Sequence, residues 1–186
     1  LENKVIIVTG GSGLLGKEFI QHSKKEGATV INSDVNLKTN LDRLEVYTDI
    51  TSQNSIDETI QLVLNKFGRI DGLVNNAYPR TQDWSNKFED IKLDSWKENV
   101  DMQLNSYFYF SQKVLDIMKE QKSGSIVNIA SIYGVVGNDF TVYEGTNLTP
   151  PAAYSAIKGG LINFSRYLAS YFGKYNVRVN LSLIHI

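Results

Sequence analysis

The sequence predicts an α/β protein with a parallel β-sheet that is covered by helices on both faces. Short apolar, β-branched runs alternate with longer segments that have apolar residues at helical spacing. The runs are apolar almost throughout, as strands are when both faces of a parallel sheet are buried. The first run ends in a glycine-rich turn, and later runs end in small polar residues, where open α/β sheets bind ligands. We expect residues 1–186 to form one domain.

Composition argues against several classes of protein. The 19 basic and 20 acidic residues are interspersed and give a net charge of −1, so we expect no nucleic-acid or membrane partner. No apolar run approaches the roughly 18 residues of a membrane span, and no signal peptide is recognisable. The chain has no cysteine, and its two histidines lack metal-ligand spacing, so no metal site is expected. A cytoplasmic protein with a small-molecule substrate fits best.

The expected elements follow from these patterns. The predicted strands are residues 4–9, 28–32, 44–47, 69–74, 125–130 and 176–181. The predicted helices are residues 17–26, 52–67, 95–120 and 152–172, and Asp94 is a plausible N-cap for the third. Residues 78–88 and 132–151 are expected to be loops.

The turn after the first strand has the composition of a phosphate-binding loop. Its glycines would let backbone N–H groups approach a pyrophosphate, and the following helix would add partial positive charge. A plain strand-to-helix turn remains the alternative, because a glycine-rich loop alone is a weak signal. The candidate residues are Gly10, Ser12, Gly13, Leu14, Leu15 and Gly16.

Asp34 follows the second predicted strand and lies 21 residues after Gly13. An acidic side chain at an offset of about 20 residues binds a ribose hydroxyl in dinucleotide-binding folds, and its charge repels a 2′-phosphate. The position therefore predicts NAD in preference to NADP. A solvated loop aspartate is the alternative.

Tyr154 and Lys158 are four residues apart in the last predicted helix and so share one face. A phenol has an unperturbed pKa of about 10, and a neighbouring ammonium favours the phenolate. The pair could thus act as a base near neutral pH. The same spacing is common in amphipathic helices, so the pair alone does not decide the function.

Together these residues resemble the short-chain dehydrogenase/reductase family over nearly the whole chain. The resemblance implies a Rossmann-type, three-layer α/β/α fold and a nicotinamide cofactor. The motifs that carry it are Thr9-Gly-Gly-Ser-Gly-Leu-Leu-Gly16, Asp34, Asp49-Ile50, Asn75-Asn-Ala77, Asn105, Ser131 and Tyr154-Ser-Ala-Ile-Lys158. By the same resemblance, further cofactor contacts are expected from Asp49, Ile50, Asn76, Ala77, Tyr154 and Lys158.

The resemblance also implies a catalytic set of Asn105, Ser131, Tyr154 and Lys158. Tyr154 would be the general acid/base, and Lys158 would favour its phenolate and hold the nicotinamide ribose. Ser131 would hydrogen-bond the reacting oxygen. Asn105 would lie at a helix kink and hold a water that relays protons to the lysine. The alternatives are a strand-end hydroxyl for Ser131 and a buried helix amide for Asn105.

The chain departs from the family pattern near the glycine-rich turn. Leu14 stands where compact, single-domain members have glycine, and the resulting spacing is closer to the longer, nucleotide-sugar-modifying branch. Asn75-Asn-Ala77 nevertheless favours the compact branch. Tyr78 replaces the glycine that often follows that motif.

Ser131 and Tyr154 are 23 residues apart, which is more than compact members have. The surplus, residues 138–151, should project over the substrate, and its hydroxyl, amide and aromatic groups suit a sugar or polyol. With Tyr78-Pro-Arg80, this segment resembles the oxidoreductases of flagellin-modification and surface-polysaccharide loci. Arg80 would meet a phosphate or carboxylate, or would be a solvated loop arginine.

Residues 181–186 match nothing in the family pattern, which continues into a closing loop, a substrate lid and a last strand. We therefore expect a truncated chain that lacks the last strand and leaves a sheet edge exposed.

The predicted function is an NAD(P)-dependent oxidoreductase, with NAD preferred, that interconverts a secondary alcohol and a ketone on a sugar or polyol-like substrate. The alternatives are a nucleotide-sugar epimerase or dehydratase with tightly bound NAD, and a non-catalytic NAD-binding fragment. The resemblance implies a homodimer or homotetramer for the full fold, built on helices 95–120 and 152–172.

Overall fold

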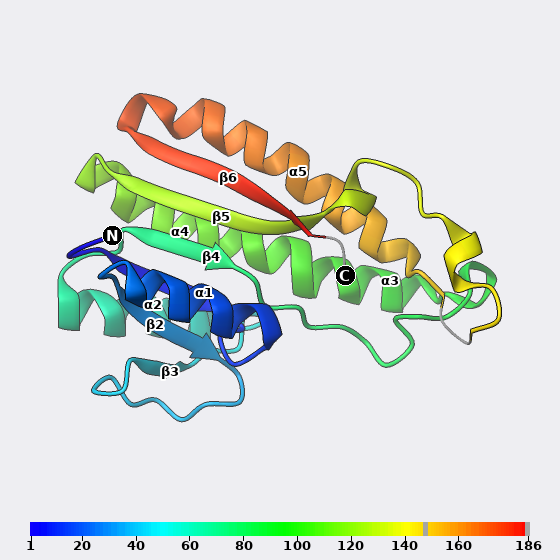
Figure 1. Cartoon of the computed structure of the whole chain (residues 1–186), viewed down its shortest axis with the longest axis horizontal. Helices are drawn as coiled ribbons and strands as arrows, with labels where there is room; N and C mark the ends of the chain where they lie inside the picture. The colour runs from blue at the N-terminus through cyan, green and yellow to red at the C-terminus, as the bar shows by residue number, and fades with distance from the viewer. Residues whose placement is uncertain (147–148, 185–186) are drawn as a thin grey trace.

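The computed structural model describes residues 1–146 and 149–184, and these form a six-stranded parallel sheet (Figure 1). The strand order is β3-β2-β1-β4-β5-β6, so the direction of winding reverses between β1 and β4. Such a reversal opens a crevice at the carboxyl ends of the strands. The strands are β1 (Val5–Thr9), β2 (Thr29–Asp34), β3 (Glu45–Tyr47), β4 (Gly72–Asn75), β5 (Gly124–Ser131) and β6 (Val177–Ile184).

Helices cover both faces of the sheet, which confirms the predicted Rossmann-type α/β fold. The α-helices are α1 (Leu14–Lys25), α2 (Gln53–Phe67), α3 (Leu93–Val100), α4 (Ser106–Gln121) and α5 (Ala152–Phe172). The shorter turns are η1 (Phe88–Asp90), η2 (Asp101–Asn105), η3 (Ile132–Gly134), η4 (Phe140–Tyr143) and η5 (Gly173–Tyr175). None of the helices in the described ranges has both the length and the hydrophobicity needed to cross a membrane.

The alternation of side chains along β1 explains why its sequence is apolar throughout. Val5 and Ile7 belong to the larger core cluster, which includes residues of α2, α4 and α5. Ile6 and Val8 belong to a smaller cluster on the other face, against which Phe19 of α1 packs. Successive residues of a strand point to opposite faces, so a strand with helices on both sides buries every residue.

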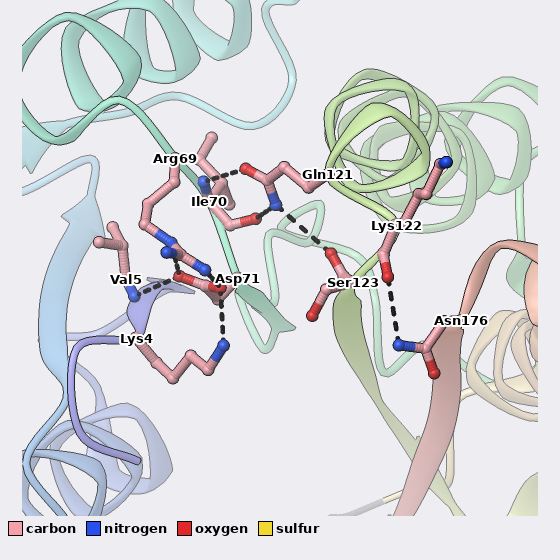
Figure 2. A network of polar contacts seen from close by, with 9 residues as sticks. All are labelled: Lys4, Val5, Arg69, Ile70, Asp71, Gln121, Lys122, Ser123 and Asn176. Atoms are coloured by element: carbon pink, nitrogen blue, oxygen red, sulfur yellow. Dashed lines mark hydrogen bonds and ion pairs between the residues drawn. The ribbon is translucent and has the colours of Figure 1, made fainter.

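A polar network joins β1 and β4 near their amino-terminal ends (Figure 2). This is the end of the sheet opposite the crevice. The Asp71 carboxylate accepts hydrogen bonds from the Val5 N–H and from the side chains of Lys4 and Arg69. Burial tends to raise the pKa of Asp71, but the bonds from Arg69, Val5 and Lys4 outweigh it and lower the pKa. The Gln121 side chain both donates to and accepts from the Ile70 backbone. These contacts hold β1, β4 and α4 together.

Several boundaries differ from those predicted. α1 begins at Leu14, three residues early, and Asp34 is the last residue of β2 rather than the start of a loop. The tail does not stand apart from the sheet, because residues 181–184 continue β6 and pair with β5. By contrast, α5 spans the predicted residues 152–172.

The predicted helix 95–120 is the largest correction. It begins at Leu93, and the N-cap is Lys92, whose backbone is extended. Asp94 is therefore not the N-cap but lies in the first turn, where its carboxylate pairs with Lys97. The π-helical turn η2 separates α3 from α4 and adds a residue to the local turn, which changes which side chains face inward.

Candidate functional site

A cavity of about 920 Å³ lies where the carboxyl ends of the strands meet the loops. Two predicted site residues, Gly16 and Asn105, do not line it. The others do, and they are Gly10, Ser12, Gly13, Leu14, Leu15, Asp34, Asp49, Ile50, Asn76, Ala77, Ser131, Tyr154 and Lys158. The cavity thus joins the glycine-rich turn after β1 to the Tyr154–Lys158 pair on α5.

The glycine-rich turn is shaped to receive an anion. Gly10 has a φ of +63°, and a Cβ on Gly16 would lie 2.2 Å from the Gly10 carbonyl oxygen, so the close approach requires glycine. The N-cap of α1, Gly13, supplies no side-chain cap, and the first turn contains no acidic residue. The first N–H groups of α1 are thus available to a pyrophosphate, which fits the nucleotide cofactor that the sequence predicts.

The end of β4 holds this turn in place. The Asn76 Nδ2 atom donates to the carbonyl oxygens of Thr9 and Gly10 at 3.0 and 3.1 Å. In return, the Thr9 hydroxyl accepts the N–H groups of Asn76 and Ala77. Gly16 also supports this turn, because its backbone packs directly against Gly10 and Gly11. It does not line the cavity.

Asp34 lies beside the glycine-rich turn, and its carboxylate is fixed by the backbone. One oxygen accepts the Ser12 N–H at 3.0 Å and the other accepts the Asn36 N–H at 2.9 Å. A carboxylate has about four lone-pair sites, so it can accept a further hydroxyl group. Asp49 is also held locally, because its Oδ1 atom accepts from both the N–H and the hydroxyl of Thr51.

Lys158 is buried, with an exposed fraction of 3%, and its Nζ atom donates to the Ile129 carbonyl oxygen at 2.6 Å. Its ammonium lies 5.5 Å from the centre of the Tyr154 ring. Burial lowers the pKa of Lys158 to about 8. Ser131, at the end of β5, accepts the Tyr133 N–H through its hydroxyl oxygen, which leaves the hydroxyl proton available to a ligand.

The surroundings of Lys158 are aromatic, and sequence reasoning missed this. Its Nζ atom lies 5.5 Å from the centre of the Tyr78 ring and 6.0 Å from that of Tyr107. Burial raises the pKa of both phenols, so neither is suited to act as a base. Tyr78 also contacts Tyr154 edge to face at 5.8 Å, and Trp84 completes a trio of rings at 5.6 and 6.3 Å.

The structure does not bring Asn105 to the site. Asn105 ends the η2 turn, is exposed, and donates its amide to Asp101 at 3.0 Å. Gln103 is the buried amide of this turn, with an exposed fraction of 2%. Helical spacing alone already separates the two, since Gln103 lies three residues after Val100 and four before Tyr107, whereas Asn105 lies on the other side of the helix. This apolar face is the sequence signal that could have identified Gln103 as a buried residue.

Gln103 belongs to a row of three buried side chains that hold the segment 77–81. Tyr107 donates its hydroxyl to the Ala77 carbonyl oxygen at 2.9 Å, and Gln103 Nε2 donates to that of Pro79 at 2.8 Å. Asn99 accepts the Thr81 N–H at 3.1 Å and donates to the Thr81 hydroxyl at 2.8 Å. Residues at intervals of four on the helices thus hold residues at intervals of two in the segment. We call Asn99, Gln103 and Tyr107 the amide–phenol row.

The connection between Ser131 and Tyr154, which includes the surplus residues 138–151, borders the cavity. Its lining residues within the described ranges are Tyr133, Asn138, Tyr143, Pro150 and Pro151. This confirms that the segment lies over the site, while residues 147 and 148 lie outside the described residues. Gly134 packs directly on α5, where a Cβ would lie 2.6 Å from the Lys158 backbone. In the described part of the chain, no group of His, Asp or Glu could hold a metal ion.

Comparisons with known proteins agree with this geometry. The family model described as short chain dehydrogenase matches residues 4–183. Post-translational flagellin modification protein A of Campylobacter coli is 32% identical, and the match covers 97% of this chain and 75% of that protein. Sorbitol-6-phosphate 2-dehydrogenase of Klebsiella pneumoniae is also 32% identical, over 96% of this chain and 67% of its own.

A solved structure with the same fold contains bound NAD+. The short chain dehydrogenase of Leptospira borgpetersenii with bound NAD+ has a TM-score of 0.84 and 31% identity. The match covers 97% of this chain and 70% of that one. With the Tyr154–Lys158 pair and the glycine-rich turn on one cavity, the chain belongs to the short chain dehydrogenase family and is an NAD(P)-dependent oxidoreductase.

Proposed function

We propose that the protein uses NAD to interconvert a secondary alcohol and a ketone on a sugar or polyol-like substrate. The observation that carries the proposal is the buried Lys158 ammonium, 5.5 Å from the Tyr154 ring, in the cavity that also reaches the glycine-rich turn. A bound nicotinamide would accept or supply the hydride. The protein's own residues then handle the proton.

Tyr154 is the general acid/base in this proposal. During oxidation its phenolate accepts the proton of the substrate hydroxyl, and during reduction its phenol returns a proton to the carbonyl oxygen. The Lys158 ammonium lies beside the Tyr154 ring, and among the described residues its Nζ atom donates only to the Ile129 carbonyl oxygen, so it has donors to spare. Ser131 donates its hydroxyl proton to the reacting oxygen, where negative charge develops.

NAD is the proposed cofactor in preference to NADP. The support is Asp34, whose carboxylate is fixed by two backbone N–H groups at the edge of the cavity. A 2′-phosphate at this position would meet that negative charge, whereas a 2′-hydroxyl could donate to it.

A polyhydroxylated substrate is supported by the far wall of the cavity. Tyr133, Asn138 and Tyr143 line it, so residues with hydroxyl and amide groups border the cavity that holds Tyr154. The comparison with a sorbitol phosphate dehydrogenase is in keeping with such a substrate.

The test is an assay of polyols and sugars with NAD or NADP, followed by absorbance of the reduced nicotinamide. Tyr154→Phe should lower turnover by about 100-fold or more, since general acid–base catalysis supplies about that factor. Its melting temperature should still rise with NAD as in the wild type. Tyr167→Phe, the same change at an exposed position of α5, is the control.

Full turnover by Tyr154→Phe would remove Tyr154 from the proposed role. A preference for NADP would refute the role of Asp34. Tightly retained NAD without net turnover would instead favour an epimerase or dehydratase.

A further inference from the structure

Arg80 lines the cavity, and hydrogen bonds hold the residues on both sides of it. Segment 77–81 is held by the amide–phenol row, and Arg80 lies between its two anchored residues Pro79 and Thr81. The Arg80 guanidinium lies over the Tyr78 ring, 5.5 Å from its centre. Tyr78 in turn contacts the Tyr154 ring at 5.8 Å. Arg80 and the proposed catalytic phenol thus contact the same Tyr78 ring.

In the described residues, no carboxylate pairs with the Arg80 guanidinium. Arg80 is exposed and lines the cavity, and among the described residues it forms no ion pair. The acidic residues that line the cavity are Asp34, which ends β2, and Asp49, which follows β3, and both lie at its cofactor end. Near Tyr154 the cavity therefore carries positive charge from Arg80 and Lys158 without an acidic lining residue. A guanidinium without an ion-pair partner favours an anionic ligand.

A second donor lies across the cavity in the surplus segment. The Asn138 side chain lines the cavity, and its Oδ1 atom accepts the Ser155 hydroxyl at 2.7 Å. Its Nδ2 atom is buried and has no hydrogen-bond partner in the described residues. Buried donors are normally paired, so this one is suited to a ligand acceptor. Because Ser155 follows Tyr154 on α5, the orientation of Asn138 is set next to the proposed base.

We propose that the substrate carries an oxyanion, a phosphate or a carboxylate, which Arg80 binds while Asn138 Nδ2 supplies a second hydrogen bond. The proposal rests on the proposed function, because it names the class of alcohol that is oxidised at Tyr154. A guanidinium presents two parallel N–H donors that match two oxygens of such a group. The substrate is then an acidic or phosphorylated polyhydroxy compound, and Arg80 determines specificity without touching the reacting atoms.

The test compares three probes with related carbon skeletons in the presence of NAD: sorbitol, sorbitol 6-phosphate and gluconate. Their dissociation constants are measured from the rise in melting temperature for the wild type, Arg80→Leu, Arg80→Lys and Asn138→Ala. The wild type should bind one of the two anions about 10- to 100-fold more tightly than sorbitol. Arg80→Leu should abolish this preference, whereas Arg80→Lys and Asn138→Ala should each keep part of it.

The control is Arg166→Leu, which removes an exposed arginine that does not line the cavity. It should bind all three probes as the wild type does. Which anion binds more tightly tells a phosphate from a carboxylate. Equal binding of sorbitol and both anions by the wild type, or an unchanged anion preference in Arg80→Leu, would overturn the proposal. Equal loss of NAD affinity and probe affinity in Arg80→Leu would also overturn it, because Arg80 would then bind the cofactor.

Failure of the proposed function has a different signature. In that case Tyr154→Phe would turn substrate over as the wild type does, whatever Arg80 binds.

Discussion

Lys158 combines deep burial with a positive charge, and this makes the free energy of unfolding depend on pH. Burial lowers the pKa of this lysine from 10.5 to about 8. Between these values the unfolded chain binds more protons than the folded chain, so stability rises with pH through this window. Below it the full cost of burying the ammonium is present.

The wild type should therefore gain about 2 kcal/mol of unfolding free energy between about pH 7.5 and 9.5. Lys158→Met should lack this gain, because it carries no titrating group. Burial raises the pKa of Tyr78 and Tyr107, so these phenols stay protonated over the same range. Denaturant titrations of both proteins at the two pH values measure the difference. Equal pH dependence would mean that Lys158 is not buried as described.

At the scale of single elements, the amide–phenol row decides how segment 77–81 is presented to the cavity. Gln103→Leu removes the bond to Pro79 and leaves that carbonyl oxygen without its donor. It also removes the unpartnered Oε1 atom of Gln103, so the net loss of unfolding free energy should be about 1 kcal/mol. Binding of substrate probes at Arg80 should weaken in parallel.

Asn105→Ala is the matched control for this substitution. Asn105 is exposed and bonded only to Asp101 in the described residues, so its removal should change the unfolding free energy by less than about 0.5 kcal/mol. Denaturant titration of both variants compares the two positions. A larger loss for Asn105→Ala than for Gln103→Leu would contradict the burial described for these two amides.

The limits of sequence reasoning are visible in the same helices. The bounds of α5 were predictable because local signals mark both ends: Pro151 precedes the helix and Gly173 follows it. The π-helical turn between α3 and α4 was not predictable, since it depends on packing against distant segments. The Tyr78 ring beside Lys158 was hidden for a similar reason. The two residues are brought together only by the docking of α5.

At the scale of the whole molecule, α4 and α5 together expose an aromatic face. Phe108, Tyr167 and Tyr171 have exposed fractions of 47%, 62% and 51%, and Phe108 contacts Phe164 of α5 at 6.0 Å. Apolar surface of this kind is suited to a helical interface between copies, as the sequence predicts. The homodimer or homotetramer stays a prediction. Tyr167→Glu should lower the molar mass found by light scattering, and an unchanged oligomer would exclude this face.

The fold class was predictable because it follows from patterns that repeat along the chain. Each strand is a local apolar run, and right-handed crossovers leave few ways to arrange such runs. The continuation of β6 through residues 181–184 was missed because this tail was compared with a family pattern instead of being read for its alternation. Its pairing with β5 requires only backbone groups.

The ring trio of Tyr78, Trp84 and Tyr154 gives the molecule an optical property. Trp84 is one of two tryptophans in the chain, and its ring lies 6.3 Å from that of Tyr154. Reduced nicotinamide absorbs light at the wavelengths where indole emits. Excitation energy should therefore pass from Trp84 to a reduced cofactor held beside Tyr154, and the fluorescence of the protein should fall as the cofactor binds. In Trp96→Phe, which leaves Trp84 as the sole tryptophan, the fall in tryptophan emission should be deeper, so the catalytic pocket carries its own spectroscopic reporter.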